Sequence, residues 1–415
     1  MFPSVARSRL LPMSLPFRYF GAAAAFQVVA WMLLLAFSNE FLAFEIGLGP
    51  VFAALHLVTL GVLAMAAIGA TLQLLPVATR QPVRALRAVK LLWWALVTGA
   101  VVFAAGAAAY RPGLMGAGAM LVVAAFALYG FLLLRNLLGA RGMRVVVLHG
   151  WAALACLAAL AASGLALVAR YEHGLALDHA AWRAAHLVLA AYGFMGLLAF
   201  GLSGFLLPML ALAPPPAQRA TILILGIAVC AIVVATWGAT AIAASLGLAA
   251  ALAHIVSLER SLRRRLRPAL GGAFLLVRVA WGCLVASLVM GLLMALDLAP
   301  PRAALVFGVL LVPGWLLTFL LGVMQRILPF LASVHASAGL ASAFTPPRLL
   351  GVHRLLHLAA LAALIAAALS GEAWLARAGA AAGLGAALVF VAFLAFILVK
   401  VRNHGIQPPH QPATA

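Results

Sequence analysis

Two histidines in long apolar segments are the residues of this sequence whose type and position best suit cofactor chemistry. His56 begins "HLVTLGVLAMAAIGATLQLLPV", a segment without a charged residue, and His186 lies two residues further from the proline that closes its own apolar segment. A neutral imidazole ligates iron or copper through one nitrogen while the other nitrogen sets its orientation, and six-coordinate heme iron needs two axial ligands. His56 and His186 are therefore predicted cofactor ligands. The alternative for each is an interfacial imidazole that contacts water or headgroups.

The connector "RYEHGLALDHAAWRAAH" gathers further groups that bind metals. His173 and His179, together with Glu172 or Asp178, form its best candidate metal site, because imidazole and carboxylate groups both bind transition metals. Asp178 also suits the N-cap position of a following helix. The alternative is that these are ordinary solvated side chains.

His353 and His357 form another candidate group, in "HRLLHLAAL". A spacing of four residues places both imidazoles on one face of a helix. Metal sites use this spacing together with a third ligand, and His149 is the only histidine predicted at a similar depth. The alternative is that these histidines share no metal. Since no nucleophile elbow, phosphate loop or HExxH motif occurs, the residues alone assign no enzyme class.

The composition is that of an all-α polytopic membrane protein. Of 415 residues, 67% are hydrophobic and 8% are charged, whereas soluble domains are roughly half apolar. The formal net charge of +20 is explained by the bias toward Lys and Arg in cytoplasmic loops. No basic stripe with interleaved aromatic residues occurs, so the expected partner is the lipid bilayer and no nucleic acid. The three cysteines lie in apolar segments without CxxC spacing and are predicted to be packing residues.

A helix needs about 20 apolar residues to cross the hydrocarbon core of a membrane. Segments of that length predict twelve spans, centred near Val29, Ala64, Val97, Ala125, Ala158, Leu197, Ala228, Leu248, Val285, Leu317, Leu364 and Val389. The break near Gly238 is the weakest, so eleven or thirteen spans are the alternatives. Basic connectors such as "ERSLRRRLR" alternate with acidic ones, which hold Glu40, Glu45, Glu172, Asp178, Asp297 and Glu372. The positive-inside rule then predicts cytoplasmic N- and C-termini. The expected location is a bacterial-type inner (plasma) membrane.

A glycine and a proline recur in one frame at the ends of the second, sixth and tenth predicted spans. The segments are "GATLQLLP", "GLSGFLLP" and "GVMQRILP", with the pairs Gly69/Pro76, Gly201/Pro208 and Gly322/Pro329. Basic endings of the fourth, eighth and twelfth spans have the same period. Together they predict one transmembrane domain of three four-helix repeats, about residues 18–142, 143–268 and 269–403, with a short cytoplasmic tail at 404–415. The alternative is coincidence, because glycine and proline are common in membrane helices.

In span number, threefold organisation and cytoplasmic ends, the chain resembles the catalytic subunit (subunit I) of the heme-copper oxidases. The segment that begins at His56 is similar to the second helix of that family, where a histidine near the outer end ligates the low-spin heme. His186, with Tyr192 nearby, lies near the place of a copper ligand. The resemblance implies heme or copper as cofactor, His56 as a ligand, and other membrane subunits as partners.

The chain also departs from that family. The tenth span, "ALVFGVLLVPGWLLTFLLGVMQ", lacks its histidine pair, and the seventh, "TILILGIAVCAIVVATWG", lacks its adjacent copper ligands. We therefore expect a role in respiration, nitrogen-oxide metabolism or metal handling, without oxygen reduction. The alternative is a cofactor-free transporter or channel. Transporters commonly hold buried charges and two-fold repeats, whereas the span interiors here are nearly free of charge; Arg278 and Arg326 are the main exceptions, and both are predicted to snorkel.

Overall fold

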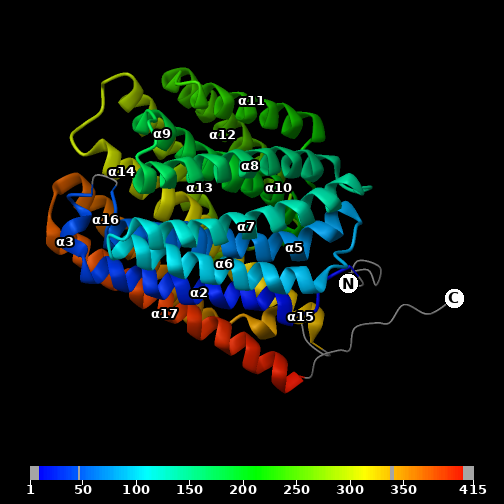
Figure 1. Cartoon of the computed structure of the whole chain (residues 1–415). Coiled ribbons are helices and arrows are strands. Elements are labelled where there is room, and N and C mark those ends of the chain that lie inside the picture. The colour runs from blue at the N-terminus through cyan, green and yellow to red at the C-terminus, as the bar shows by residue number, and fades with distance from the viewer. Residues whose placement is uncertain (1–8, 45–46, 337–340, 405–415) are drawn as a thin grey trace.

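The chain folds into a bundle of long helices, which a computed structural model describes for residues 9–44, 47–336 and 341–404 (Figure 1). Twelve helical segments in this part of the chain are long and apolar enough to cross a membrane. No β-strand occurs among the described residues. Glu45 and residues 405–415 of the predicted tail lie outside them. The chain is therefore an integral membrane protein with multiple spans, as its composition predicts.

Nine of the spans are single α-helices: α2 (Ser14–Ala36), α6 (Leu86–Ala108), α7 (Pro112–Leu138), α8 (Arg144–His173), α11 (Gln218–Thr236), α12 (Thr240–Arg263), α13 (Gly272–Ala295), α16 (Pro347–Ser370) and α17 (Ala373–His404). The other three each join two α-helices through a π-helical segment: α4 (Pro50–His56), η1 (Leu57–Ala64) and α5 (Met65–Thr79); α9 (His179–Val188), η2 (Leu189–Gly196) and α10 (Leu197–Ala211); α14 (Ala303–Val309), η3 (Leu310–Leu317) and α15 (Thr318–His335). Two short helices, α3 (Ser38–Phe41) and η4 (Ala341–Phe344), lie in connections. Every predicted span centre falls inside one of the twelve spans.

The break near Gly238 separates two spans. α11 ends at Thr236 and α12 begins at Thr240. Between them Gly238 has a φ of 87°, a left-handed conformation that glycine adopts without steric cost. The prediction of twelve spans, rather than eleven or thirteen, is confirmed.

Successive spans are antiparallel, and the last span packs against the first. α17 packs beside α2, and α2 begins at the end of the bundle where α17 finishes (Figure 1). We call this the inner end, because the connections rich in Arg and Lys lie there. The opposite end, which holds Glu40, Glu172 and Asp297, is the outer end.

The three π-helical segments occupy the same position in their spans. Leu57, Leu189 and Leu310, which begin η1, η2 and η3, each lie 19 residues before the proline of the recurring Gly/Pro frame. Each segment is 8 residues long. π-helical turns are rare and commonly occur at functional sites. These three lie between the outer parts and the inner parts of their spans.

Two rows of glycines allow each π-containing span to approach the span before it. The first row is the fifth residue of each π segment, Gly61, Gly193 and Gly314; a Cβ there would lie 2.5 Å from Phe26, 3.0 Å from Cys156 and 3.0 Å from Cys283. The second row is eight residues later, Gly69, Gly201 and Gly322; a Cβ there would lie 2.6 Å from Tyr19, 2.6 Å from His149 and 3.0 Å from Leu276. The partners belong to α2, α8 and α13 in turn. Small residues at such contacts let membrane helices pack closely.

Candidate cofactor site between His56 and His186

His56 and His186 both lie in the outer parts of their spans. His56 is the last residue of α4, directly before η1, and His186 lies in α9, three residues before η2. The two imidazoles are close enough to interact electrostatically. The structure therefore brings together the two histidines that the sequence selects as cofactor ligands.

Hydrogen bonds fix the orientation of both rings. The Nδ1 of His56 lies 3.1 Å from the carbonyl oxygen of Phe52, and because a carbonyl only accepts, this nitrogen carries the proton. Ser163 donates to the carbonyl of Leu160 (2.9 Å), so its hydroxyl oxygen accepts from the Nδ1 of His186 at 3.2 Å. Each neutral imidazole is left with its lone pair on Nε2.

Aromatic rings and a close helix contact surround the two imidazoles. The ring of His56 contacts those of Phe52 (centroids 4.1 Å apart) and Phe103 (4.9 Å), and these two rings also contact each other (6.2 Å). His186 packs on α8 at Gly164, where a Cβ would lie 3.2 Å from its Cε1. Both histidines are partly exposed. A free Nε2 whose Nδ1–H is held by an acceptor is the arrangement that metal-ligating histidines show, so these donors suit heme iron or a copper ion.

A second pair of histidines, His149 and His254, lies deeper toward the inner end. The Nδ1 of His149 donates to the carbonyl of Val145 at 2.8 Å, and its Nε2 is buried without a hydrogen-bond partner. His254 donates from Nε2 to Ser203 (3.0 Å), whose hydroxyl donates to the carbonyl of Phe200. The His254 ring stacks on Phe200, with centroids 4.0 Å apart. The two imidazoles interact electrostatically with each other.

His353 and His357 lie on one face of α16, as their spacing predicts, with rings parallel and centroids 6.0 Å apart. The Nε2 of His357 lies 2.7 Å from Thr318, and Thr318 donates to the carbonyl of Pro313, so His357 is the donor. Gln325 accepts from Arg354 through Oε1 and donates from Nε2 to the Nδ1 of His353 at 2.8 Å. The remaining nitrogens, His353 Nε2 and His357 Nδ1, are buried and unpaired.

The other predicted metal ligands lie at the outer end, where His173 and Asp178 are exposed and Glu172 and His179 are partly buried. His173 has three quarters of its side chain exposed and lies 3.7 Å from Glu172. His179 contacts the edge of the Tyr171 ring. Asp178 accepts hydrogen bonds from the amides of Ala180 and Ala181, which confirms the predicted N-cap. Within residues 9–44, 47–336 and 341–404, no three His, Cys, Asp or Glu side chains are grouped to hold a metal ion, so neither His149 nor an acidic residue completes a three-ligand set.

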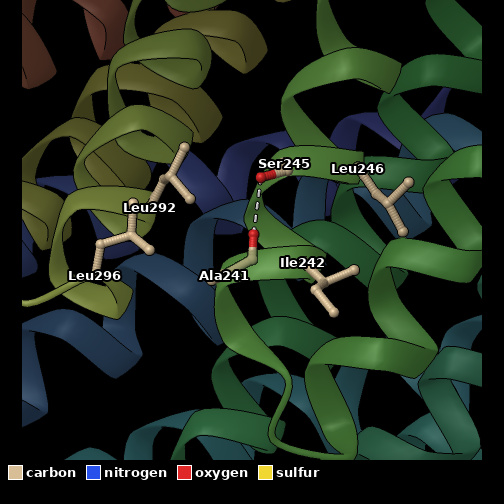
Figure 2. A pocket seen from close by; sticks show the side chains of 6 residues that line it. All are labelled: Ala241, Ile242, Ser245, Leu246, Leu292 and Leu296. Atoms are coloured by element: carbon tan, nitrogen blue, oxygen red, sulfur yellow. Dashed lines mark hydrogen bonds between the residues drawn. The ribbon is translucent and has the colours of Figure 1, made fainter.

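A groove on the surface of the bundle lies between α12 and α13, and no charged or metal-binding side chain lines it (Figure 2). Its walls are Ile242, Leu246, Leu292 and Leu296, together with Ala241 and Ser245. The hydroxyl of Ser245, its one polar side-chain group, donates to the carbonyl of Ala241 in its own helix at 2.9 Å. Apolar walls with no free polar group suit a lipid chain.

Comparison with known proteins adds no family to these observations: no family model matches the chain, and no curated protein matches it significantly. The site therefore rests on the residues themselves.

Sequence reasoning did not identify the polar residues that orient the histidines. Ser163, Ser203, Thr318 and Gln325 stand in apolar segments, and all four are buried. Their types gave a signal, because a buried hydroxyl or amide needs a partner. Which imidazole each one meets depends on the packing of helices far apart in the sequence.

Proposed function

We propose that this membrane protein binds heme or copper between His56 and His186, as a divergent relative of the heme-copper oxidase catalytic subunit. It resides in a bacterial-type inner membrane with both termini in the cytoplasm, and takes part in respiration, nitrogen-oxide metabolism or metal handling. Heme iron or copper would supply one-electron chemistry there. The chain supplies two imidazoles and an apolar wall made by Phe52 and Phe103.

The observation that carries this proposal is the paired orientation of the two imidazoles. The Nδ1 of His56 donates to the Phe52 carbonyl, and the Nδ1 of His186 donates to the Ser163 hydroxyl. Both Nε2 lone pairs are thus available to a metal, on spans that approach from different parts of the chain. A histidine that only caps a helix end or meets headgroups needs no such second partner.

The relation to the oxidase subunit is supported by the threefold pattern of the spans. The π segments η1, η2 and η3 and the two glycine rows have one register, and each π-containing span packs on the span before it at equivalent positions. Thr71 bonds Tyr129 at 2.9 Å, and Ser203 bonds His254 at 3.0 Å. Thr71 and Ser203 are each two residues after the glycine of the second row, so polar contacts follow the same register.

The proposal does not extend to oxygen reduction. α11 carries no histidine, and the one histidine in α14, η3 and α15 is His335, the last residue of α15. Tyr192 is engaged elsewhere: its hydroxyl bonds Ser287 at 3.2 Å and its ring stacks on Trp315. The residues present therefore suit one site with two histidines, rather than a binuclear heme-copper centre.

The test is the absorption spectrum and metal content of the full chain, expressed with a heme precursor and copper and purified in a mild detergent. We expect a Soret band with heme in the pyridine hemochrome assay, or copper by mass spectrometry. His56→Ala and His186→Ala should each lose the cofactor, while eluting from a sizing column as the parent does.

His173→Ala is the matched control, because it removes an exposed histidine at the same end of the bundle and should keep the parent's cofactor. A parent without heme or copper would refute the proposal and favour the cofactor-free transporter or channel. Variants at His56 and His186 with the parent's cofactor content would refute the assignment of these ligands.

A further inference from the structure

Three arginines gather at the inner end around the connection between α12 and α13. Arg267 lies in that connection, Arg326 comes from α15 and Arg354 from α16. Arg326 donates from one terminal nitrogen to the carbonyl of Leu270 at 3.2 Å. Arg354 lies against Gly272, where a Cβ would be 2.3 Å from its Nε. Both side chains therefore reach the same short stretch of backbone.

Arg326 is held in place yet incompletely bonded. Its guanidinium lies over the ring of Phe274, 5.8 Å from the centroid. Its Nε is buried and has no hydrogen-bond partner, although a buried N–H without an acceptor is costly. Arg267 is close enough to Arg326 for the two positive charges to repel each other. An anion would accept from the unpaired N–H and would also reduce the repulsion between the two arginines.

In the part of the chain that the structure describes, no carboxylate pairs with these arginines. It contains 7 acidic residues, of which Glu259 is the one at the inner end. Glu259 accepts from Arg278 through both oxygens, at 2.8 Å and 2.9 Å. The other acidic residues belong to outer connections or helix ends, and Glu45 among them lies outside the described residues. Among the described residues, none of the three arginines forms an ion pair.

A phosphate group fits this environment better than other anions. A guanidinium presents a planar fork of N–H donors that matches phosphate oxygens, and several forks can share one phosphate. Basic pockets between membrane helices at the cytoplasmic side commonly bind anionic lipid headgroups. Arg326 and Arg354 belong to spans, and both reach the backbone around Leu270 and Gly272, at the level where a headgroup phosphate would lie.

We propose that Arg267, Arg326 and Arg354 form a phosphate-binding site between the inner ends of α13, α15 and α16. Its ligand is a phosphate-bearing anion, and the two sources to be separated are an anionic phospholipid and a free phosphate. The site is independent of the cofactor proposed at the outer end.

The experiment measures binding to the purified full chain by native mass spectrometry and by the unfolding midpoint. Phosphatidylglycerol, phosphatidylcholine and inorganic phosphate are added separately. We expect phosphatidylglycerol to bind and to raise the midpoint, with phosphatidylcholine binding far less. The double variant Arg326→Gln/Arg354→Gln should bind at least about tenfold more weakly, since each charged hydrogen bond lost is worth about a factor of ten or more.

Two further variants allow the proposal to be tested even if the double variant folds poorly. Gly272→Ala retains every charge but displaces Arg354, so it should also weaken binding. Arg84→Gln/Arg87→Gln removes two exposed arginines at the same end and should bind as the parent does. Stabilisation by inorganic phosphate alone, abolished in the double variant, would identify a free anion as the ligand. Equal binding of both phosphate sources by the parent, the double variant and Gly272→Ala would overturn the proposal.

Discussion

Substitution of Gly201 by alanine tests whether the second glycine row holds neighbouring spans together. A Cβ at Gly201 would lie 2.6 Å from the Cβ of His149 and 2.9 Å from its Cγ. Ordinary carbon contacts are ~3.5–4.0 Å, so α10 and α8 would have to separate by about 1 Å. The Cβ of His149 cannot give way, because it is fixed to its backbone and the ring is bonded to Val145.

The size of the effect follows from two opposing terms. Overpacking of a tight contact costs about 1–3 kcal/mol, whereas replacing a helical glycine by alanine gains about 0.5–1 kcal/mol. Gly201→Ala should therefore destabilise the protein by about 1–2 kcal/mol. Gly204→Ala is the matched control in the same helix, since a Cβ there would meet nothing within 4 Å. It should be neutral or stabilising.

The assay is the unfolding midpoint in detergent, followed by tryptophan fluorescence at one scan rate because membrane proteins often unfold irreversibly. Gly69→Ala, which would meet the Cβ of Tyr19 at 2.6 Å, should behave like Gly201→Ala. If Gly201→Ala unfolds at the same midpoint as Gly204→Ala, or above it, then α8 and α10 do not pack as closely as described, and the reasoning fails.

Two other substitutions probe polar contacts. Thr318→Val removes the acceptor of His357, whose other nitrogen is already unpaired, so we expect a loss of about 1–3 kcal/mol in stability by the same unfolding assay. Thr236→Val, at an exposed hydroxyl, should change little, and equal midpoints for the two variants would contradict the assigned hydrogen bond. Asp178→Ala removes the N-cap of α9 and should cost about 0.5–2 kcal/mol, measured as faster hydrogen exchange at the amides of Ala180 and Ala181. Asp178→Asn keeps a capping oxygen and should retain the protection of these amides. Unchanged exchange in Asp178→Ala would show that the cap is not needed.

The spans were predictable because their signal is local. A continuous apolar segment of sufficient length must satisfy its own backbone hydrogen bonds in a membrane, and a helix does so without any other part of the chain. Even the weakest break, between α11 and α12, was indicated in the sequence by Gly238, since glycine is common where a helix ends. The recurring Gly/Pro frame likewise stands in the sequence at fixed intervals.

The pairing of the histidines was less predictable. The number of residues from a span's end gives the depth of a side chain, but the direction it faces depends on how each helix is rotated in the bundle. Depth alone selected His149 as a candidate partner for His353 and His357, whereas in the structure its imidazole interacts with that of His254. No sequence pattern singles out His254. His56 and His186 could be selected because both lie at one depth on corresponding spans.

The π-helical segments have a consequence for how such a chain can vary. A π turn holds one residue more than an α turn, so each of these segments acts as a single inserted residue. Removing that residue from η1 would rotate everything on one side of it by about 100° relative to the other side. His56 and Gly69 stand on opposite sides, and both could not then keep their present neighbours. The outer and inner parts of each such span are thus set separately. The direction in which His56 points can change without disturbing the contact at Gly69 that anchors the helix.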